Sequence, residues 1–159
     1  MFQIKHKTSG EVLYELAART MEGAKFDGML LRGAAFNRCV LNRAKFVKTD
    51  LEGADFSRTS LANADFSEAN LIRAVFQGAT LMRAMLVKAD LGSSCLRNAS
   101  FFQADLTGAN LEGADLQGAD FTEAELAEAD FGGARYDRRT RWPDGIDPLE
   151  RGAVLVNEG

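Results

Sequence analysis

The chain has 159 residues, of which 46% are hydrophobic and 26% charged, and its formal net charge is −4. This length and composition predict one folded domain and exclude a disordered chain. A single His and two Cys exclude a histidine-based catalytic triad, a histidine-rich metal site and a disulfide framework, so we expect no enzyme and no cofactor. The slight acidic excess argues against direct binding of nucleic acid.

The first residues contain no apolar segment of the kind that a signal peptide requires, and no run of about 18 apolar residues could span a membrane. Two cysteines in a chain whose first residues do not resemble a signal peptide indicate thiols that stay reduced. We therefore expect a cytoplasmic protein that makes no membrane contact.

Residues 1–20 precede any regular pattern. Residues 2–6 alternate as a strand does, residues 7–10 are typical of a turn, and residues 12–14 could form a returning strand. A competing interpretation is a short helix over 11–18 with Ser9 as its N-cap. We favour the strand–turn–strand alternative, in which His6 is a surface residue and not a ligand.

From Met21 to Tyr136 the sequence repeats every five residues without interruption. Taking every fifth residue gives 24 positions, which hold 13 Leu, 9 Phe, one Met and one Tyr. The residue two places earlier is Ala in 18 of the 24 units. Asp or Asn often stands immediately before the central residue, and Gly often ends the unit.

This spacing fits neither a helix, which needs a period of about 3.6, nor an ordinary strand, which needs a period of about 2. The small residue and the central residue lie two apart, so both point inward from a short extended segment. The Gly or Asn near the end of each unit supplies the positive φ that a type II turn requires.

The repeat resembles the pentapeptide-repeat family, whose units are written A(D/N)LxX, over about three-quarters of the chain. The resemblance implies an all-β fold, a right-handed quadrilateral β-helix with four units in each coil. The 24 units then make about six coils, and at about 4.8 Å per coil the rod is roughly 29 Å tall. It also implies three segments, an N-terminal cap (1–20), the solenoid (21–138) and a C-terminal cap (139–159).

A coil of four units places residues that are 20 apart directly above one another. Numbering the faces from Met21, Phe fills the second and fourth faces of the lower coils, where opposing rings should meet across a narrow interior. On the third face Asp alternates with Asn before the central residue, at Asp50, Asn70, Asp90 and Asn110. Like charges are then about two coils apart, which limits their repulsion.

The tail after Tyr136 contains the only Trp and both Pro. It resembles the WPxGFDP-type tail of many bacterial pentapeptide-repeat proteins, with Ile146 where Phe is common. We expect Trp142 and Ile146 to cover the open core, because a solenoid end needs a cap. Residues 153–156 could fold back as a strand or project from the end, and an end-to-end dimer is the alternative to a monomer.

The net charge conceals a gradient along the chain. Residues 21–97 carry eleven bases and eight acids, whereas residues 98–134 carry eight acids and no base. We name these eight residues the acidic tier: Asp105, Glu112, Asp115, Asp120, Glu123, Glu125, Glu128 and Asp130.

Four apolar residues occupy outward positions near the middle of the solenoid, where polar residues are the rule. A cluster of this kind on a solenoid wall can mark a partner surface, although scattered apolar residues are normal on any surface. We name these four candidates the apolar patch: Met82, Met85, Val87 and Phe102.

These features favour a noncatalytic protein-binding or scaffolding solenoid with an unknown protein partner. One alternative follows from the resemblance, because some family members mimic duplex DNA, bind type II topoisomerases such as DNA gyrase and confer quinolone resistance. A second alternative is a purely structural domain with no partner.

Overall fold

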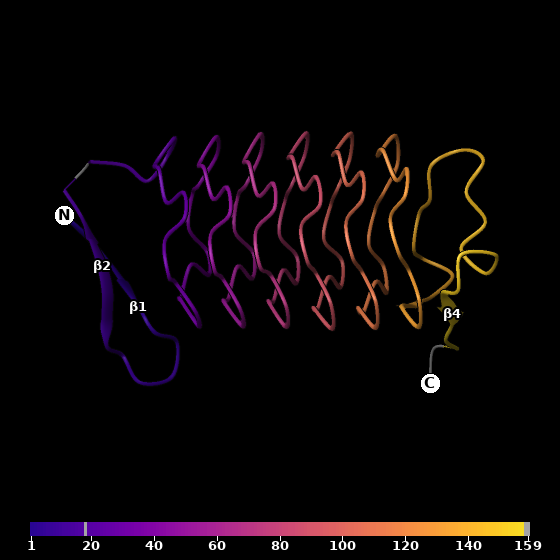
Figure 1. The fold of residues 1–159 in the computed structure, drawn as a ribbon, viewed down its shortest axis with the longest axis horizontal. Coiled ribbons are helices and arrows are strands. Elements are labelled where there is room, and N and C mark those ends of the chain that lie inside the picture. Colours follow the sequence, from indigo (N-terminus) through magenta and orange to yellow (C-terminus); the bar gives the residue numbers. More distant parts are fainter. Residues whose placement is uncertain (18, 158–159) are drawn as a thin grey trace.

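The computed structural model describes residues 1–17 and 19–157, which form a straight rod with one terminus at each end (Figure 1). Four short strands are β1 (Phe2–Lys5), β2 (Val12–Leu16), β3 (Arg135–Tyr136) and β4 (Val154–Leu155). No helix occurs among the described residues. The expected all-β class is therefore confirmed.

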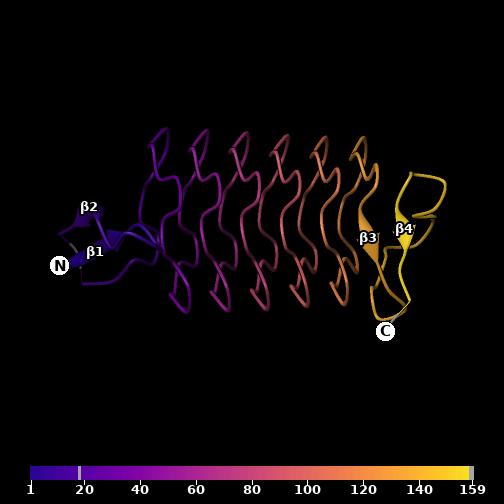
Figure 2. The ribbon, with the colours of Figure 1, turned by 90° about the horizontal axis from the view of Figure 1, so that it is seen from below.

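Between the caps the chain winds in stacked coils that Figure 2 shows side by side along the rod. Parallel β-bridges join one residue of each pentapeptide unit to its equivalent in the next coil, from Lys25 and Lys45 at the lower end to Asp115 and Arg135 at the upper end. Each bridge carries backbone hydrogen bonds, as where Phe26 N donates to Lys45 O at 2.7 Å and Lys45 N donates to Ala24 O at 2.8 Å. The structural repeat is therefore a coil of four pentapeptide units, as expected.

A tight turn closes every unit. Ala34 N donates to Leu31 O at 3.1 Å across one such turn, and Gly33 at its third position has φ of 65°. The sequence predicted Gly or Asn here, but most units place another residue at this position, such as Arg58 with φ of 55°. A left-handed conformation costs an L-residue roughly 1–2 kcal/mol. The ladder offsets this cost, because the N–H of Arg58 donates to Gln77 O of the next coil at 2.9 Å.

Phenylalanine rings fill the lower core in two interlocking stacks. Phe46 and Phe66 of one face stack with their centroids 4.8 Å apart, and Phe56 of the opposite face meets Phe46 edge-on at 5.6 Å. These rings are fully buried. Offset-stacked and edge-to-face geometries are the favourable ones for aromatic pairs, so the predicted meeting of rings across the interior is confirmed.

Two threonines replace Ala at inward positions and keep their hydroxyls satisfied. Thr49 Oγ1 donates to Phe26 O at 2.8 Å, and Thr59 Oγ1 donates to Phe36 O at 2.7 Å. A buried hydroxyl without a partner would be destabilising. At these two positions a carbonyl of the coil below lies within reach, so the interior accepts the polar residue.

The alternation of Asp and Asn on the third face forms a hydrogen-bonded ladder. Asn70 Nδ2 donates to Asp50 Oδ1 at 3.1 Å, and Asn110 Nδ2 donates to Asp90 Oδ1 at the same distance. Each of these side chains also accepts a backbone N–H two residues later, as Asp90 does from Gly92 at 3.0 Å. Each Asn therefore supplies an amide donor at a level where an Asp would bring two carboxylates of neighbouring coils into repulsive contact.

The N-terminal segment forms the hairpin of the favoured alternative, with β1 antiparallel to β2. Ile4 is buried, and the ring of Tyr14 lies edge-on to Phe26 at 6.0 Å, so the hairpin covers the first coil. Lys5 O accepts the N–H of Ala35 at 2.8 Å. The side chain of His6 accepts hydrogen bonds from the turn that follows β1. Residue 18, at the end of the competing helix, lies outside the described residues.

At the C-terminal end, Trp142 continues the column of the first face. Asp120 pairs with Arg141, whereas the repeat would place residue 140 opposite it, so the chain contains one insertion here. The indole of Trp142 stacks on Phe121 with a centroid distance of 5.3 Å and an interplanar angle of 17°. Ile146 packs against the same core while partly buried, and β4 pairs in parallel with β3. The predicted covering role of Trp142 and Ile146 is therefore confirmed.

Replacing Asn70 with Asp tests the ladder of the third face. Asn70→Asp removes the amide donor and places a carboxylate between Asp50 and Asp90, so we expect stability to fall by about 1 kcal/mol. High salt should recover part of this loss, because it screens the added charge. Thermal unfolding at low and high salt measures both effects. The control is Asn63→Asp, which lies outside this ladder; an equal loss in both variants would contradict the explanation.

Asp137 gives the C-terminal cap a pH dependence. Its carboxylate is buried, and although burial alone raises its pKa, hydrogen bonds from the Arg139 side chain and from the N–H groups of Gly118 and Arg139 lower the pKa overall. The ionised group therefore stabilises the cap above its unfolded pKa of about 3.9, and this contribution disappears as the pH falls through the lower folded value. Emission of Trp142 measured from neutral to acid pH should report the opening of the cap.

In Asp137→Asn this carboxylate titration is absent, and the cap should be less stable at neutral pH by roughly 1–3 kcal/mol. Asp144→Asn is the control, since Asp144 is exposed in the same segment. An acid profile of Asp137→Asn identical to that of the wild type would show that Asp137 does not anchor the cap.

Candidate functional site

The second face of the rod has a column of outward residues whose charge changes sign along its length. β-Bridges connect its members in order, with bases in the first two coils and acids in the last two. We name it the central column: Lys25, Lys45, Asp65, Met85, Asp105 and Glu125. Lys25, Lys45, Met85 and Glu125 are exposed, and the two aspartates are half-buried. The column is therefore an electric dipole with an apolar residue inside it.

The corner between the first and second faces has a parallel order of charge. Arg83 Nε donates to Gln103 Oε1 at 2.9 Å, and Gln103 Nε2 donates to Glu123 Oε2 at 2.6 Å. Arg43 occupies the same turn position two coils below Arg83. This corner column is therefore also basic below and acidic above, and a glutamine relay links its upper members.

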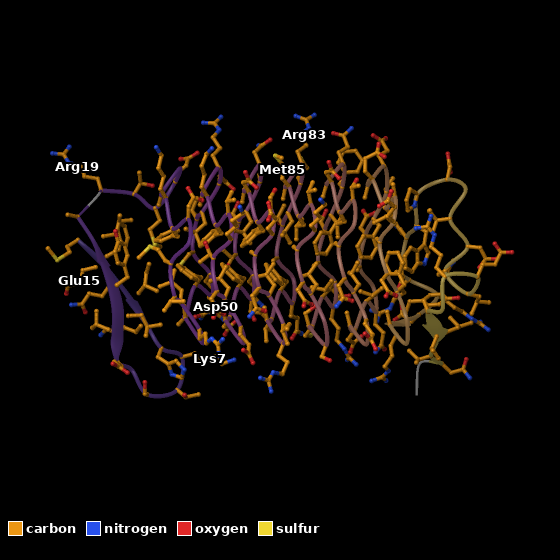
Figure 3. The ribbon with its side chains drawn as sticks, viewed as in Figure 1. Lys7, Glu15, Arg19, Asp50, Arg83 and Met85 are labelled. Atoms are coloured by element: carbon orange, nitrogen blue, oxygen red, sulfur yellow. The ribbon has the colours of Figure 1, made fainter. Side chains whose placement is uncertain are left out.

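The structure brings the apolar patch together on these two faces. Met82 and Phe102 hold the same turn position in adjacent coils, where Arg83 N donates to Phe102 O at 2.9 Å. Met85 lies between Asp65 and Asp105 in the central column. Met82 and Met85 are 38% and 46% exposed, and Val87 and Phe102 are half-buried. Figure 3 shows Arg83 and Met85 along the same edge of the rod, away from Asp50.

We name the surface formed by the central column, the corner column and the apolar patch the dipolar wall. Methionine side chains are flexible and polarisable, so they adapt to a partner surface. Ordered charges on either side of them would fix the direction in which that partner lies. The wall can therefore supply both contact area and orientation.

The acidic tier is less uniform than its sequence suggests. Four of its aspartates accept the backbone N–H two residues later, which stabilises their own turns; for Asp105, Asp120 and Asp130 these bonds measure 2.9, 2.9 and 2.8 Å. The fourth is Asp115, on the fourth face, where its Oδ2 accepts Arg97 Nε at 2.6 Å. Burial raises the pKa of Asp115, but the hydrogen bonds from Arg97 and Gln117 lower it overall.

All four glutamates of the tier, Glu112, Glu123, Glu125 and Glu128, are exposed. Three tier residues form the acidic end of the dipolar wall, Asp105 and Glu125 in the central column and Glu123 in the corner column. Two more border it, Asp120 on the first face and Glu128 in the turn after the second face. The tier is therefore concentrated on one side of the rod and joined there to the apolar patch.

Sequence reasoning missed a pocket under the N-terminal hairpin. It has a volume of about 440 Å³ and is lined by apolar side chains that include Phe2, Ile4, Met21 and Phe36. Cys39 also lines it, and burial raises the pKa of this thiol. The pocket depends on how the hairpin packs against the first coils, for which the repeat contains no signal.

Two exposed residues near the same end also escaped the sequence analysis. Leu30 and Val40 are 80% and 55% exposed, more than any member of the apolar patch. They stand at outward positions of different faces, two or more coils below that patch.

Within residues 1–17 and 19–157, no group of three or more His, Cys, Asp or Glu side chains could hold a metal ion. The described part of the chain also has no helix that is long and apolar enough to cross a bilayer. Cys39 and Cys95 are both free thiols.

Comparison with solved structures identifies several with the same architecture. A pentapeptide repeat protein from the thylakoid lumen of Arabidopsis thaliana is 33% identical, with a TM-score of 0.51 over 62% of this chain. The matched region spans 65% of that protein's length. QnrB1, a plasmid-mediated fluoroquinolone resistance protein, is 19% identical, with a TM-score of 0.57 over 86% of this chain and 85% of its own. At this identity the second likeness shows the fold alone.

No curated protein matches the sequence. The family of Pentapeptide repeats does match it, in eight copies over residues 21–58, 59–98 and 99–135, which together cover most of the chain. These matched residues coincide with the stacked coils. The chain therefore belongs to the pentapeptide-repeat family and has its right-handed quadrilateral β-helix fold.

Proposed function

We propose that this protein is a noncatalytic scaffold that binds another protein through the dipolar wall. The observation that carries the proposal is the central column, where an exposed methionine lies between a basic end and an acidic end. A purely structural domain has no need for this order, because the lower and upper coils would be equally stable with charges of either sign interspersed.

The rod supplies a rigid base for such an interface. The outward residues of the wall belong to extended segments and turns that are hydrogen-bonded to neighbouring coils. Little backbone entropy is therefore lost on binding. Interfaces concentrate affinity in a few central side chains, with aromatic residues and Met enriched, which fits Met82, Met85 and Phe102. Cytoplasmic localisation is part of this proposal.

Phe102→Glu tests the wall directly. We expect it to weaken partner binding about tenfold or more, because a charge would be forced into the apolar centre of the interface. Affinity capture from extracts of the native cell with wild type and variant, followed by mass spectrometry, identifies a partner whose recovery depends on Phe102. Titration of that purified partner then measures the affinity.

Gln77→Glu is the matched control, since residue 77 is exposed at the equivalent position of its own turn but follows Phe76 on the fourth face, away from the wall. The control should bind as the wild type does. A partner recovered equally with all three proteins would contradict the proposed role of the wall.

A second candidate function is inhibition or protection of a type II topoisomerase such as DNA gyrase. It is favoured by the acidic tier, whose exposed glutamates extend from the upper coils, and by the fold likeness to QnrB1 over most of both chains. In this function the acidic surface would take the place of the DNA phosphates at the enzyme.

A supercoiling assay tests this second function. We expect the protein, at micromolar concentration and low salt, to reduce supercoiling by gyrase or to protect gyrase from a fluoroquinolone. The double variant Glu125→Lys with Glu128→Lys should remove this effect. Charge-driven binding of this kind weakens as salt rises. Unchanged supercoiling with and without drug at every concentration would exclude gyrase as the target.

A further inference from the structure

We propose that the dipolar wall binds the dipolar wall of a second copy of this chain, with the two rods antiparallel. This inference rests on the proposed function, in that it treats the wall as an interaction surface, and it names the partner. It is distinct from an end-to-end dimer, because the two ends of the rod take no part.

The charge order of the central column is complementary to its own reverse. A two-fold axis that lies in the plane between the two walls, perpendicular to the rods and at the level between the coils of Asp65 and Met85, places Lys25 opposite Glu125 of the second copy and Lys45 opposite Asp105 of the second copy. The same operation repeats both pairs on the other side of the axis. Four opposite-charge pairs therefore form along one column.

The pairing of levels between the two rods can hold over the whole wall because the spacing between successive coils is the same in both copies. Residues of the column are one coil apart, about 4.8 Å, in each rod. A match at one level is therefore a match at every level. The contact is isologous, so it closes as a dimer and leaves no site open for a filament.

The apolar patch lies at the centre of this arrangement. Met85 of each copy is next to the axis, level with Asp65 of the other copy and one coil from its Met85, and Met85 is 46% exposed in the single chain. On the edge next to the first face, Phe102 comes level with Asn42 of the second copy, and on the other edge Glu68 comes level with Lys88 of the second copy.

Sedimentation velocity over a concentration series tests the dimer. The wild type should dimerise at low salt and dissociate as salt rises, because its specificity comes from exposed charges. Lys45→Glu and Asp105→Lys, each alone, should weaken dimerisation about tenfold, since each variant turns two attractive pairs into two repulsive ones. Position 105 accepts Lys, because Lys25 and Lys45 occupy the same slot of the repeat.

Mixing the two single variants distinguishes the antiparallel arrangement from others. In the mixed dimer, Glu at position 45 faces Lys at position 105 of the other copy, and the second pair is native. The mixture should therefore recover the wild-type affinity, which a parallel or end-to-end contact does not predict. The double variant, Lys45→Glu with Asp105→Lys, should recover it as well.

Arg58→Glu is the control, because it reverses an exposed charge on the fourth face, opposite the wall, and should leave dimerisation unchanged. Circular dichroism and thermal unfolding of each variant verify that the rod is intact. A wild type that stays monomeric up to about 1 mM at low salt, or a mixture without recovery, overturns the inference. If the chain is monomeric but affinity capture recovers a different protein with the wild type and not with Phe102→Glu, the proposed function stands and this inference fails.

Discussion

The hydrogen-bond ladder between coils is the constraint on which the rest of this structure depends. Each extended segment donates to and accepts from its equivalents in the adjacent coils, so the height of every residue along the rod is fixed by its number. The narrow interior follows from it, since coils at strand spacing bring opposite faces close enough for Phe46 and Phe56 to touch. Small residues, mostly Ala, therefore fill the remaining inward positions between the rings.

The same ladder turns the sequence into surface columns. A side chain at a given turn or strand position meets its counterparts one coil above and below, as Asn70 meets Asp50 and Gln103 meets Glu123. Charge and apolar area can therefore be distributed on one wall without disturbing the core. This is how the dipolar wall coexists with a continuous hydrophobic interior.

Much of this could be predicted from sequence because the five-residue period is uninterrupted. It predicted the fold class, the inward Phe stacks, the Asp and Asn ladder and the covering role of Trp142. The inserted residue before Trp142 was missed, because the tail leaves the repeat where Asp137 and Thr140 rebuild the turn through hydrogen bonds. The pocket under the hairpin was missed because it depends on tertiary packing. The charge order of the central column was missed although the twenty-residue spacing that predicted the Asp and Asn ladder also places its members one above another.

The pentapeptide unit also determines how such a rod can change in length. Removing or adding a whole coil shifts everything above by one level and leaves every column aligned. Removing or adding a single unit in the middle of the rod turns the coils above it by a quarter revolution about the rod axis. Asp105 and Glu125 would then lie on a different face from Lys25 and Lys45. One duplicated unit could therefore convert one two-signed wall into two walls of opposite sign while the core of Leu and Phe stays filled.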